Sequence, residues 1–176
     1  MIHNHLNRIY HFKGNPREIG FTAGRMLGNR LEQTLNHYIA EFPNPKDMEK
    51  LHTGALSWLR SLPHRFQEEF EGLAEGANIP LQRLVEFDYI EECDVIKCSG
   101  AIFPFENNVW VARNNDTYVP ELWGYVTIRE VEGRIPTINF SMEGDVFTPT
   151  GINKEKLWLH YNFLSVWDQP APDKPH

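Results

Sequence analysis

The sequence has few cysteines, no long apolar run and no basic block. Its two cysteines, Cys93 and Cys98, lie five residues apart, which excludes a disulfide framework and a complete metal site. No stretch approaches the roughly 18 to 20 apolar residues that a membrane-spanning helix needs. The opening MIHNHLNRIYHF has no apolar core of the secretory kind. We therefore expect a cytoplasmic protein that does not use a membrane.

Positive charge is also scarce. The formal net charge is -7, so neither a nucleic-acid backbone nor an anionic membrane surface is the expected partner. The 176 residues, 41% of them hydrophobic, are enough for one globular domain with a packed core. His3, His5 and His11 crowd the N-terminus without a nearby cysteine or carboxylate to complete a metal site. We expect no metal and no other cofactor.

Residues 14–92 predict an almost wholly helical block, preceded by an edge strand within residues 6–13. A long helix begins in GNPREIGFTAGRMLGNRLEQTLNHYIAEF. Asn15 is its expected N-cap, Pro16 its first helical residue, and Glu18 stands three residues after the cap. Further helices are predicted to begin at Pro45, Pro63 and Pro80.

Three glycines fall four residues apart on one ridge of the first predicted helix. They are Gly20, Gly24 and Gly28. Each costs about 1 kcal/mol against alanine in a helix interior. We therefore expect a close backbone approach along this ridge to compensate, with a tolerated weakness as the alternative.

From Asp94 onward the pattern is typical of β-structure. The expected elements are adjacent antiparallel strands at 98–103 and 108–112, a hairpin of Val126–Val131 and Ile135–Phe140 turning at Glu132–Gly133, then a turn at 146–151 and an apolar strand within 151–167. The end, DQPAPDKPH, has too many prolines for a sheet interior. The fold class is therefore α+β, with helices before residue 98 and antiparallel strands after it.

The stretch CSGAIFPFENNVWVARNND carries the candidate chemistry. If its two strands pair, Cys98 at the start of one lies at the same edge as Arg113 and Asp116 at the end of the other. A nucleophile, a cation and a carboxylate then share one corner. Arg113 would stabilise the thiolate, and Asp116 would orient an ammonium group or the substrate.

A cysteine that opens a strand gains reactivity when the preceding peptide bond is broken. Cleavage of Lys97–Cys98 gives Cys98 a free α-amine, which serves as general base for its own thiol. The Cys98 thiolate can itself attack the Lys97 carbonyl, shift the acyl group from nitrogen to sulfur and leave a thioester for water. While the bond is intact the nitrogen is an amide, so the precursor would be inactive.

Two other interpretations remain open at this point. Arg113 and Asp116 can be an ordinary strand-end ion pair, with Cys98 a buried structural thiol. Alternatively, Cys98 can be paired with a histidine base. His160 is the only later histidine besides the terminal His176, and in the apolar run LWLHYNF it is typical of a half-buried strand residue.

Several segments together resemble the acyl-coenzyme A:6-aminopenicillanic acid acyltransferase family of N-terminal-nucleophile hydrolases, which is related to the bile-salt and penicillin V hydrolases. GNPREIGFTAGRMLG resembles the opening pro-segment, and FEGLAEGANIPLQRLVEFDYIEE the helical stretch before the nucleophile. CSGAIF is similar to the nucleophile strand, ARNNDTY to an Arg-Asn-x-Asp signature, and GINKEKLWLHYNF to a segment with Gly-x-Asn and a second asparagine.

The resemblance implies a four-layer αββα fold and hydrolysis or acyl transfer at non-peptide amide bonds through an acyl-enzyme. It implies Cys98 as the nucleophile, Arg113 and Asp116 in the substrate and amine network, and Asn162 as the oxyanion-hole asparagine. Residues 1–97 would be the helical pro-segment or α subunit, 98–168 the N-terminal part of the sandwich, and 169–176 a proline-rich tail or a truncation end. The partner would be a small-molecule amide or acyl donor.

Two departures from the family pattern stand out. Lys97 occupies a position where the best-known member has glycine, and a long side chain there would slow or alter self-cleavage. The chain also ends about 80 residues after Cys98, short of what two stacked sheets with outer helices require. We expect an N-terminal portion of a longer enzyme, a natural remnant or half of a split protein. The alternative function is a catalytically silent module that assembles through an open sheet edge, with itself or with a missing half.

Overall fold

The computed structural model describes residues 8–40, 45–93, 98–116 and 120–161. Within these ranges the chain forms five α-helices, one short 3-10 helix and seven strands. The strands form two sheets, which confirms the α+β class. The helices are α1 Pro16–Leu27, α2 Asn29–Ala40, α3 Pro45–Ser61, α4 His64–Ala77 and α5 Leu81–Cys93. The strands are β1 Ile9–Gly14, β2 Cys98–Phe105, β3 Asn108–Asn115, β4 Trp123–Val131, β5 Thr137–Met142, β6 Thr150–Asn153 and β7 Trp158–His160.

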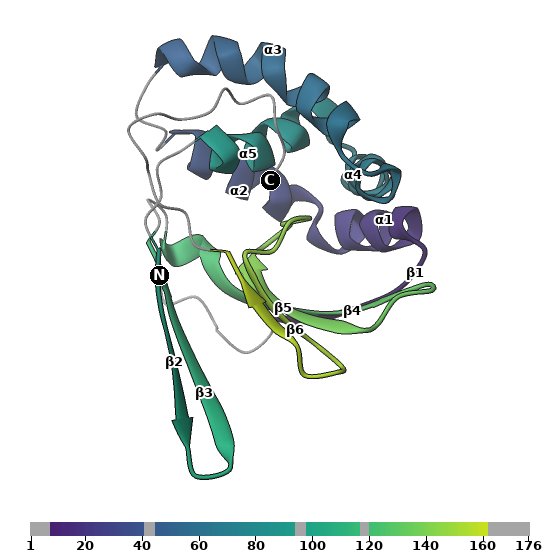
Figure 1. Cartoon of the computed structure of the whole chain (residues 1–176). Coiled ribbons are helices and arrows are strands. Elements are labelled where there is room, and N and C mark those ends of the chain that lie inside the picture. The colour runs from purple at the N-terminus through teal and green to yellow at the C-terminus, as the bar shows by residue number, and fades with distance from the viewer. Residues whose placement is uncertain (1–7, 41–44, 94–97, 117–119, 162–176) are drawn as a thin grey trace.

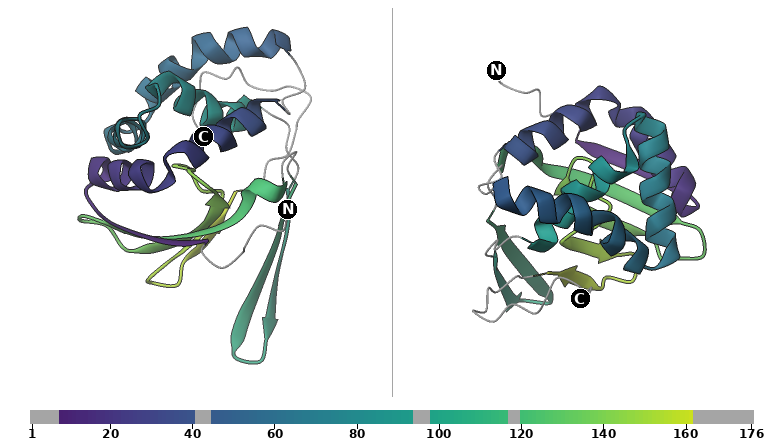
Figure 2. Two further views of the ribbon diagram at one scale, coloured as in Figure 1. Left: turned by 180° about the vertical axis from the view of Figure 1, so that it is seen from behind. Right: turned by 90° about the horizontal axis from the view of Figure 1, so that it is seen from above.

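The larger sheet has the strand order β1-β4-β5-β6-β7. The predicted edge strand is confirmed as β1, which runs parallel to β4. The predicted hairpin is confirmed as β4 and β5, and β6 and β7 continue the sheet antiparallel. The predicted apolar strand after the turn is instead two short strands, because the chain turns again at Lys156, whose φ is 65°. All five helices lie on one side of this sheet (Figures 1 and 2).

The two faces of the larger sheet have different surroundings. Tyr10 and Phe12 of β1 are buried in the core beneath the helices. The alternate positions point to the other face, which none of the described helices covers (Figure 2). The register places the following apolar residues there: Val126, Ile128, Ile138, Phe140 and Ile152. We call this set the open face. A sheet that is apolar on both faces is typical of one buried between two layers.

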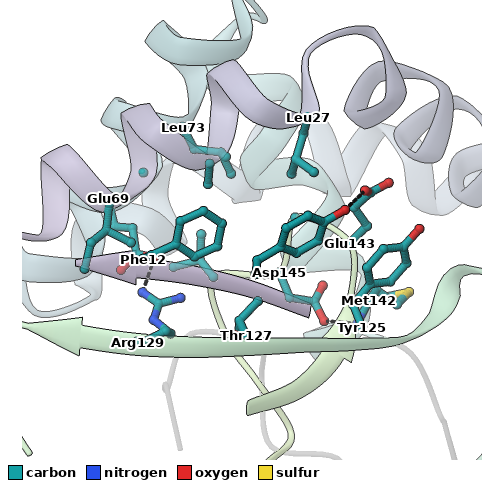
Figure 3. A pocket seen from close by; sticks show the side chains of 16 residues that line it. Phe12, Leu27, Glu69, Leu73, Tyr125, Thr127, Arg129, Met142, Glu143 and Asp145 are labelled. Carbon is teal, nitrogen blue, oxygen red and sulfur yellow. Dashed lines mark hydrogen bonds and ion pairs between the residues drawn. The ribbon is translucent and has the colours of Figure 1, made fainter. Parts of the chain in front are cut away.

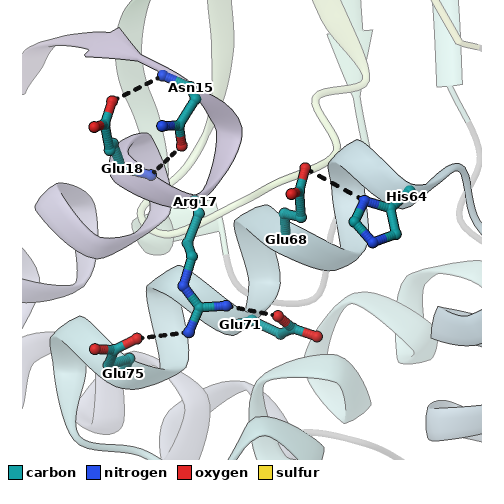
Figure 4. A network of polar contacts seen from close by, with 7 residues as sticks. All are labelled: Asn15, Arg17, Glu18, His64, Glu68, Glu71 and Glu75. Carbon is teal, nitrogen blue, oxygen red and sulfur yellow. Dashed lines mark hydrogen bonds and ion pairs between the residues drawn. The ribbon is translucent and has the colours of Figure 1, made fainter.

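The helical layer begins as the sequence predicts. The Asn15 side chain accepts a hydrogen bond from the Glu18 amide, and the Glu18 side chain accepts one from the Asn15 amide, each at 3.0 Å (Figure 4). This capping box satisfies two amide donors at the start of α1. The single long helix predicted after Asn15 is wrong, however. The chain breaks at Gly28, which has a φ of 49°, and α2 starts at the next residue.

The first two ridge glycines make the close approach that the spacing predicts. A Cβ added to Gly20 would lie 2.1 Å from the Glu69 carbonyl oxygen of α4, and one added to Gly24 would lie 2.4 Å from the Leu73 carbonyl oxygen. Across this interface Arg17 donates to Glu71 and Glu75, each at 2.8 Å (Figure 4). Gly28 does not belong to the contact, since nothing lies within 4 Å of its added Cβ. It ends the helix instead.

The smaller sheet is the hairpin of β2 and β3, which confirms the predicted pairing and extends it to Phe105 and Asn108. It forms a separate two-stranded sheet. In Figure 1 it projects from the molecule on the side away from the helices. Its base, and not its tip, lies against the larger sheet.

Candidate functional site

The base of the hairpin brings two of the predicted site residues into contact. Cys98 pairs with Asn115 in the β2–β3 register. The Arg113 guanidinium Nη2 lies 3.3 Å from the Cys98 Sγ, and the thiol donates to the Asn115 Oδ1 at 3.3 Å. Cys98 is half-buried. A cation and an amide oxygen therefore flank an accessible thiol.

Arg113 also fixes the hairpin to the larger sheet. Its Nη1 donates to the Thr150 hydroxyl of β6, and its Nη2 donates to the Tyr161 carbonyl oxygen at 2.6 Å and to the Asn115 Oδ1 at 2.9 Å. Its Nε is buried and has no hydrogen-bond partner among the described residues. The guanidinium is thus held by Asn115, Thr150 and Tyr161 at once. We call this contact between the base of the hairpin and the larger sheet the junction, and it fixes the position of Arg113 relative to the thiol.

Asp116 is placed differently from the expectation. It is exposed, and its Oδ1 accepts a hydrogen bond from the Asn114 Nδ2 at 2.6 Å. Among the described residues it forms no ion pair with Arg113, so the strand-end ion pair considered as an alternative is not formed. Lys97 and Asn162 lie outside the described residues, and their roles stay predictions.

His160 approaches the same face of the hairpin. A Cβ added to Gly100 would lie 3.1 Å from the His160 Nε2. Gly100 and Cys98 are two residues apart on β2 and therefore share a face. On the other side of the ring, the Trp158 indole Nε1 donates to the His160 Nδ1 at 2.9 Å. The half-buried strand position expected for this residue is confirmed.

The Trp158 contact decides which nitrogen of His160 carries the proton. An indole N–H only donates, so Nδ1 must accept and is unprotonated. The neutral ring then carries its hydrogen on Nε2, toward Gly100. In this arrangement His160 offers a hydrogen-bond donor to the thiol face, and it is poorly set up as a base there.

Sequence reasoning missed Asn115, Thr150 and Trp158 as parts of this junction. The position of Asn115 could have been predicted from the sequence, since a two-residue turn at 106–107 places Asn115 opposite Cys98. Thr150 had none: it lies 37 positions from Arg113, and only the tertiary fold joins them. Thr150 pairs with Phe140 of the open face, so the junction lies on the side of the sheet away from the helices.

A second polar cluster lies in the core between α1 and the larger sheet (Figure 3). Arg129 and Glu69 form a buried ion pair, and Tyr10 donates to Glu143 at 2.8 Å. Burial, and then the contact with Glu143, raises the pKa of Tyr10 to about 12. Burial likewise raises the pKa of Glu69, although Arg129 opposes the shift.

Asp145 completes this core cluster. Its Oδ2 accepts from the Met142 amide at 2.9 Å, while its Oδ1 is buried without a partner among the described residues. Burial, followed by the charge of Asp88, raises the pKa of Asp145 well above 3.8. The cavity at this place measures about 20 Å³, room for about one water molecule. It is therefore too small for an organic substrate.

Among the described residues, no group of three or more His, Cys, Asp or Glu side chains is arranged to hold a metal ion. None of the described helices is long and apolar enough to cross a membrane. Neither a scan against protein-family models nor a search of curated proteins finds a match to this chain.

Proposed function

We propose that the chain is, or belongs to, an N-terminal-nucleophile cysteine enzyme that cleaves non-peptide amide bonds. It would pass the acyl group through a thioester on Cys98 to water or to an amine. The observation that carries the proposal is the contact of the Cys98 thiol with the Arg113 guanidinium at 3.3 Å. A nearby cation favours the thiolate, which is the reactive form.

The proposed activation is a self-cleavage that needs only water. The Cys98 thiolate attacks the Lys97 carbonyl carbon, and the C–N bond breaks as the acyl group moves to sulfur. The former amide nitrogen takes up a proton and becomes the α-amine of Cys98. Water then hydrolyses the thioester, which leaves a carboxylate on Lys97 and a free thiol on Cys98.

In the mature enzyme the new α-amine would serve as the base for the thiol. Two neighbours support this role. The Asn115 Oδ1 accepts from the thiol and orients it, and Arg113 stabilises the thiolate once the proton has left. Because Thr150 and Tyr161 also bind the Arg113 guanidinium, little reorganisation is needed when the charge forms.

His160 is a further donor for the developing oxyanion in this proposal. Its Nε2–H faces the Gly100 backbone on the thiol side of the hairpin. Neutral imidazole acts in this way when its other nitrogen is already engaged as an acceptor. The role would complement the amide of Asn162, which the family resemblance assigns to the oxyanion hole.

The layers of the molecule support the αββα part of the proposal. In the described residues one helical layer packs on one face of the larger sheet, and the open face of that sheet is apolar. A second sheet packed at about 10 Å would bury it. The junction that holds Cys98 lies on this side, where two sheets of a sandwich would meet. The division at residue 97 and the assignment of 98–168 to the sandwich remain predictions.

The test is the denatured intact mass of freshly purified protein. We expect two fragments that divide before Cys98, no cleavage in Cys98→Ala and normal cleavage in Cys93→Ala, the matched control for loss of a thiol. Arg113→Met should slow cleavage by about tenfold or more, since it removes the cation beside the thiol. An uncut chain of 20.6 kDa in all four proteins would contradict self-activation.

A second candidate function rests on a different observation. The hairpin exposes large apolar side chains, among them Val109 at 67% and Ile102 at 64%. Such exposure is typical of an interaction surface. A catalytically silent module would keep this surface and show neither cleavage nor amide hydrolysis.

A further inference from the structure

The β2–β3 hairpin carries the densest group of exposed apolar side chains among the described residues. These are Ile102, Phe103, Phe105, Val109 and Trp110, whose exposed fractions run from 47% to 67%. From full side-chain areas of about 150–250 Å², they present on the order of 600 Å² of apolar surface. That is as large as the largest patch on a typical monomer. A patch of this size is often a functional interaction surface.

Both faces of the hairpin take part. Phe103 lies opposite Trp110 on one face, and Ile102 lies opposite Val111 on the other. A solvated antiparallel ribbon alternates between apolar and polar residues, whereas a strand in a two-layer structure is apolar on both sides. The hairpin is therefore built as the interior part of a larger sheet.

Its two edges are not equivalent. Phe105 and Asn108 flank the two-residue turn and exchange hydrogen bonds, so the next pair, Pro104 and Val109, directs its main-chain groups outward. Proline has no N–H, and this blunts the β2 edge. On β3, Val109 and Val111 present outward N–H and C=O groups with no strand beside them in the described chain. The β3 edge is therefore the more open of the two to pairing.

A strand added to β3 would extend beneath the open face of the larger sheet. The base of β3 is joined to β6 and its neighbour through Arg113, which binds Thr150 and Tyr161. In Figure 1, β3 is the hairpin strand nearer to the larger sheet. An element that pairs at this edge would therefore bury the apolar side chains of both the open face and the hairpin.

We propose that this element is a second copy of the same chain, with β3 pairing antiparallel to β3 of the partner about a two-fold axis. The two hairpins would form a continuous four-stranded sheet that closes at two copies, since both outer β2 edges are blunted. The hairpin supplies most of the roughly 800 Å² per partner that a standard interface buries. The open face supplies the rest.

The charge pattern allows this self-association. From Ser99 to Ala112 the only charged side chain is Glu106, which lies at the turn. Two antiparallel copies of β3 therefore meet without like charges face to face, despite the net charge of -7 on each chain. The proposal does not depend on the amide chemistry of Cys98, because neither the paired β3 edge nor the open face requires a reactive thiol.

The test uses two proline variants at one register position. Val111→Pro removes an outward N–H from the β3 edge, and Ile102→Pro removes the opposite one from the β2 edge. Neither change breaks the hydrogen bonds between the two strands. In sedimentation equilibrium, the full chain should give twice the chain mass of 20.6 kDa. Val111→Pro should raise the dimer dissociation constant about tenfold or more, because both copies carry the substitution and two equivalent hydrogen bonds are lost. Ile102→Pro should change the dissociation constant less than about threefold.

Each other outcome would overturn the proposal. A full chain that stays monomeric at high micromolar concentration would show that the apolar hairpin is covered by something other than a second copy. Equal effects of the two variants would remove the assignment to the β3 edge. Growth beyond two copies would contradict the blunted β2 edge. Far-ultraviolet circular dichroism on both variants checks that each retains the fold of the full chain.

Discussion

Replacing Gly20 by alanine should destabilise the protein even though alanine is the better helix former. The added Cβ would lie 2.1 Å from the Glu69 carbonyl oxygen and 2.8 Å from the Leu73 amide nitrogen. Both are backbone atoms of α4, so no side-chain rotation can make room. A normal contact requires more than 3.0 Å, which means that α1 and α4 must separate locally by about 1 Å.

The size of the effect follows from two opposing terms. Alanine gains about 1 kcal/mol over glycine in a helix interior. Overpacking typically costs about 1–3 kcal/mol, and this site lies at the upper end because the opposing atoms are fixed. The same interface is closed from the other side, since a Cβ on Gly72 would lie 2.2 Å from the Arg17 carbonyl oxygen. We expect a net loss of about 2 kcal/mol, or about 4–8 °C in Tm.

Urea unfolding followed by circular dichroism measures this loss. Gly28→Ala is the control, because nothing lies within 4 Å of its added Cβ and its φ of 49° alone opposes the change. With a ψ of -128° this conformation is sparsely populated for residues with a Cβ and costs about 1–3 kcal/mol, so a loss in this variant comes from the backbone and not from helix packing. If Gly20→Ala were as stable as the unmodified chain, the close α1–α4 packing would be refuted.

Three further predictions concern the core and the junction. Asp145→Asn should become more stable relative to the unmodified chain as the pH rises. Burial raises the folded-state pKa of Asp145, so the unmodified chain loses stability as the pH rises from the ordinary pKa of 3.8 through the raised pKa. Stability curves of the two proteins that run parallel against pH would contradict this. Arg129→Met should cost about 3–5 kcal/mol in urea unfolding by leaving Glu69 buried and unpaired, and Arg129→Met combined with Glu69→Leu should recover much of the loss. His160→Leu should lower amide hydrolysis about a hundredfold, whereas His160→Gln, which can still donate, should keep most of it; equal loss in both would favour a histidine base.

Local signals predicted the elements of this fold with good accuracy. Asn15 and Glu18 predicted the first capping box, and Glu132–Gly133 predicted the turn of the β4–β5 hairpin. The capping box and the hairpin turn each join atoms only a few residues apart, so a short stretch of sequence contains the whole interaction. The break at Gly28 escaped prediction because the apolar periodicity continues across it, and periodicity alone does not report a backbone that turns left-handed.

Distant contacts were predicted only where a short turn fixes the register. The turn after Phe105 sets the pairing of the whole hairpin, so the approach of Arg113 to Cys98 was predictable. The parallel pairing of β1 with β4 and the bond from Arg113 to Thr150 were not. They join segments that are distant in sequence, and only the tertiary fold brings these segments together.

The most direct test of the proposed chemistry is to trap the acyl-enzyme. Purified protein is mixed with a series of N-acyl p-nitroanilides, quenched in acid and weighed as denatured fragments. We expect the fragment that begins at Cys98 to gain the mass of one acyl group, with release of p-nitroaniline, and no adduct in Cys98→Ala. Adducts that form equally in Cys98→Ala, or an uncut chain that never acquires an acyl group, would contradict an N-terminal cysteine nucleophile.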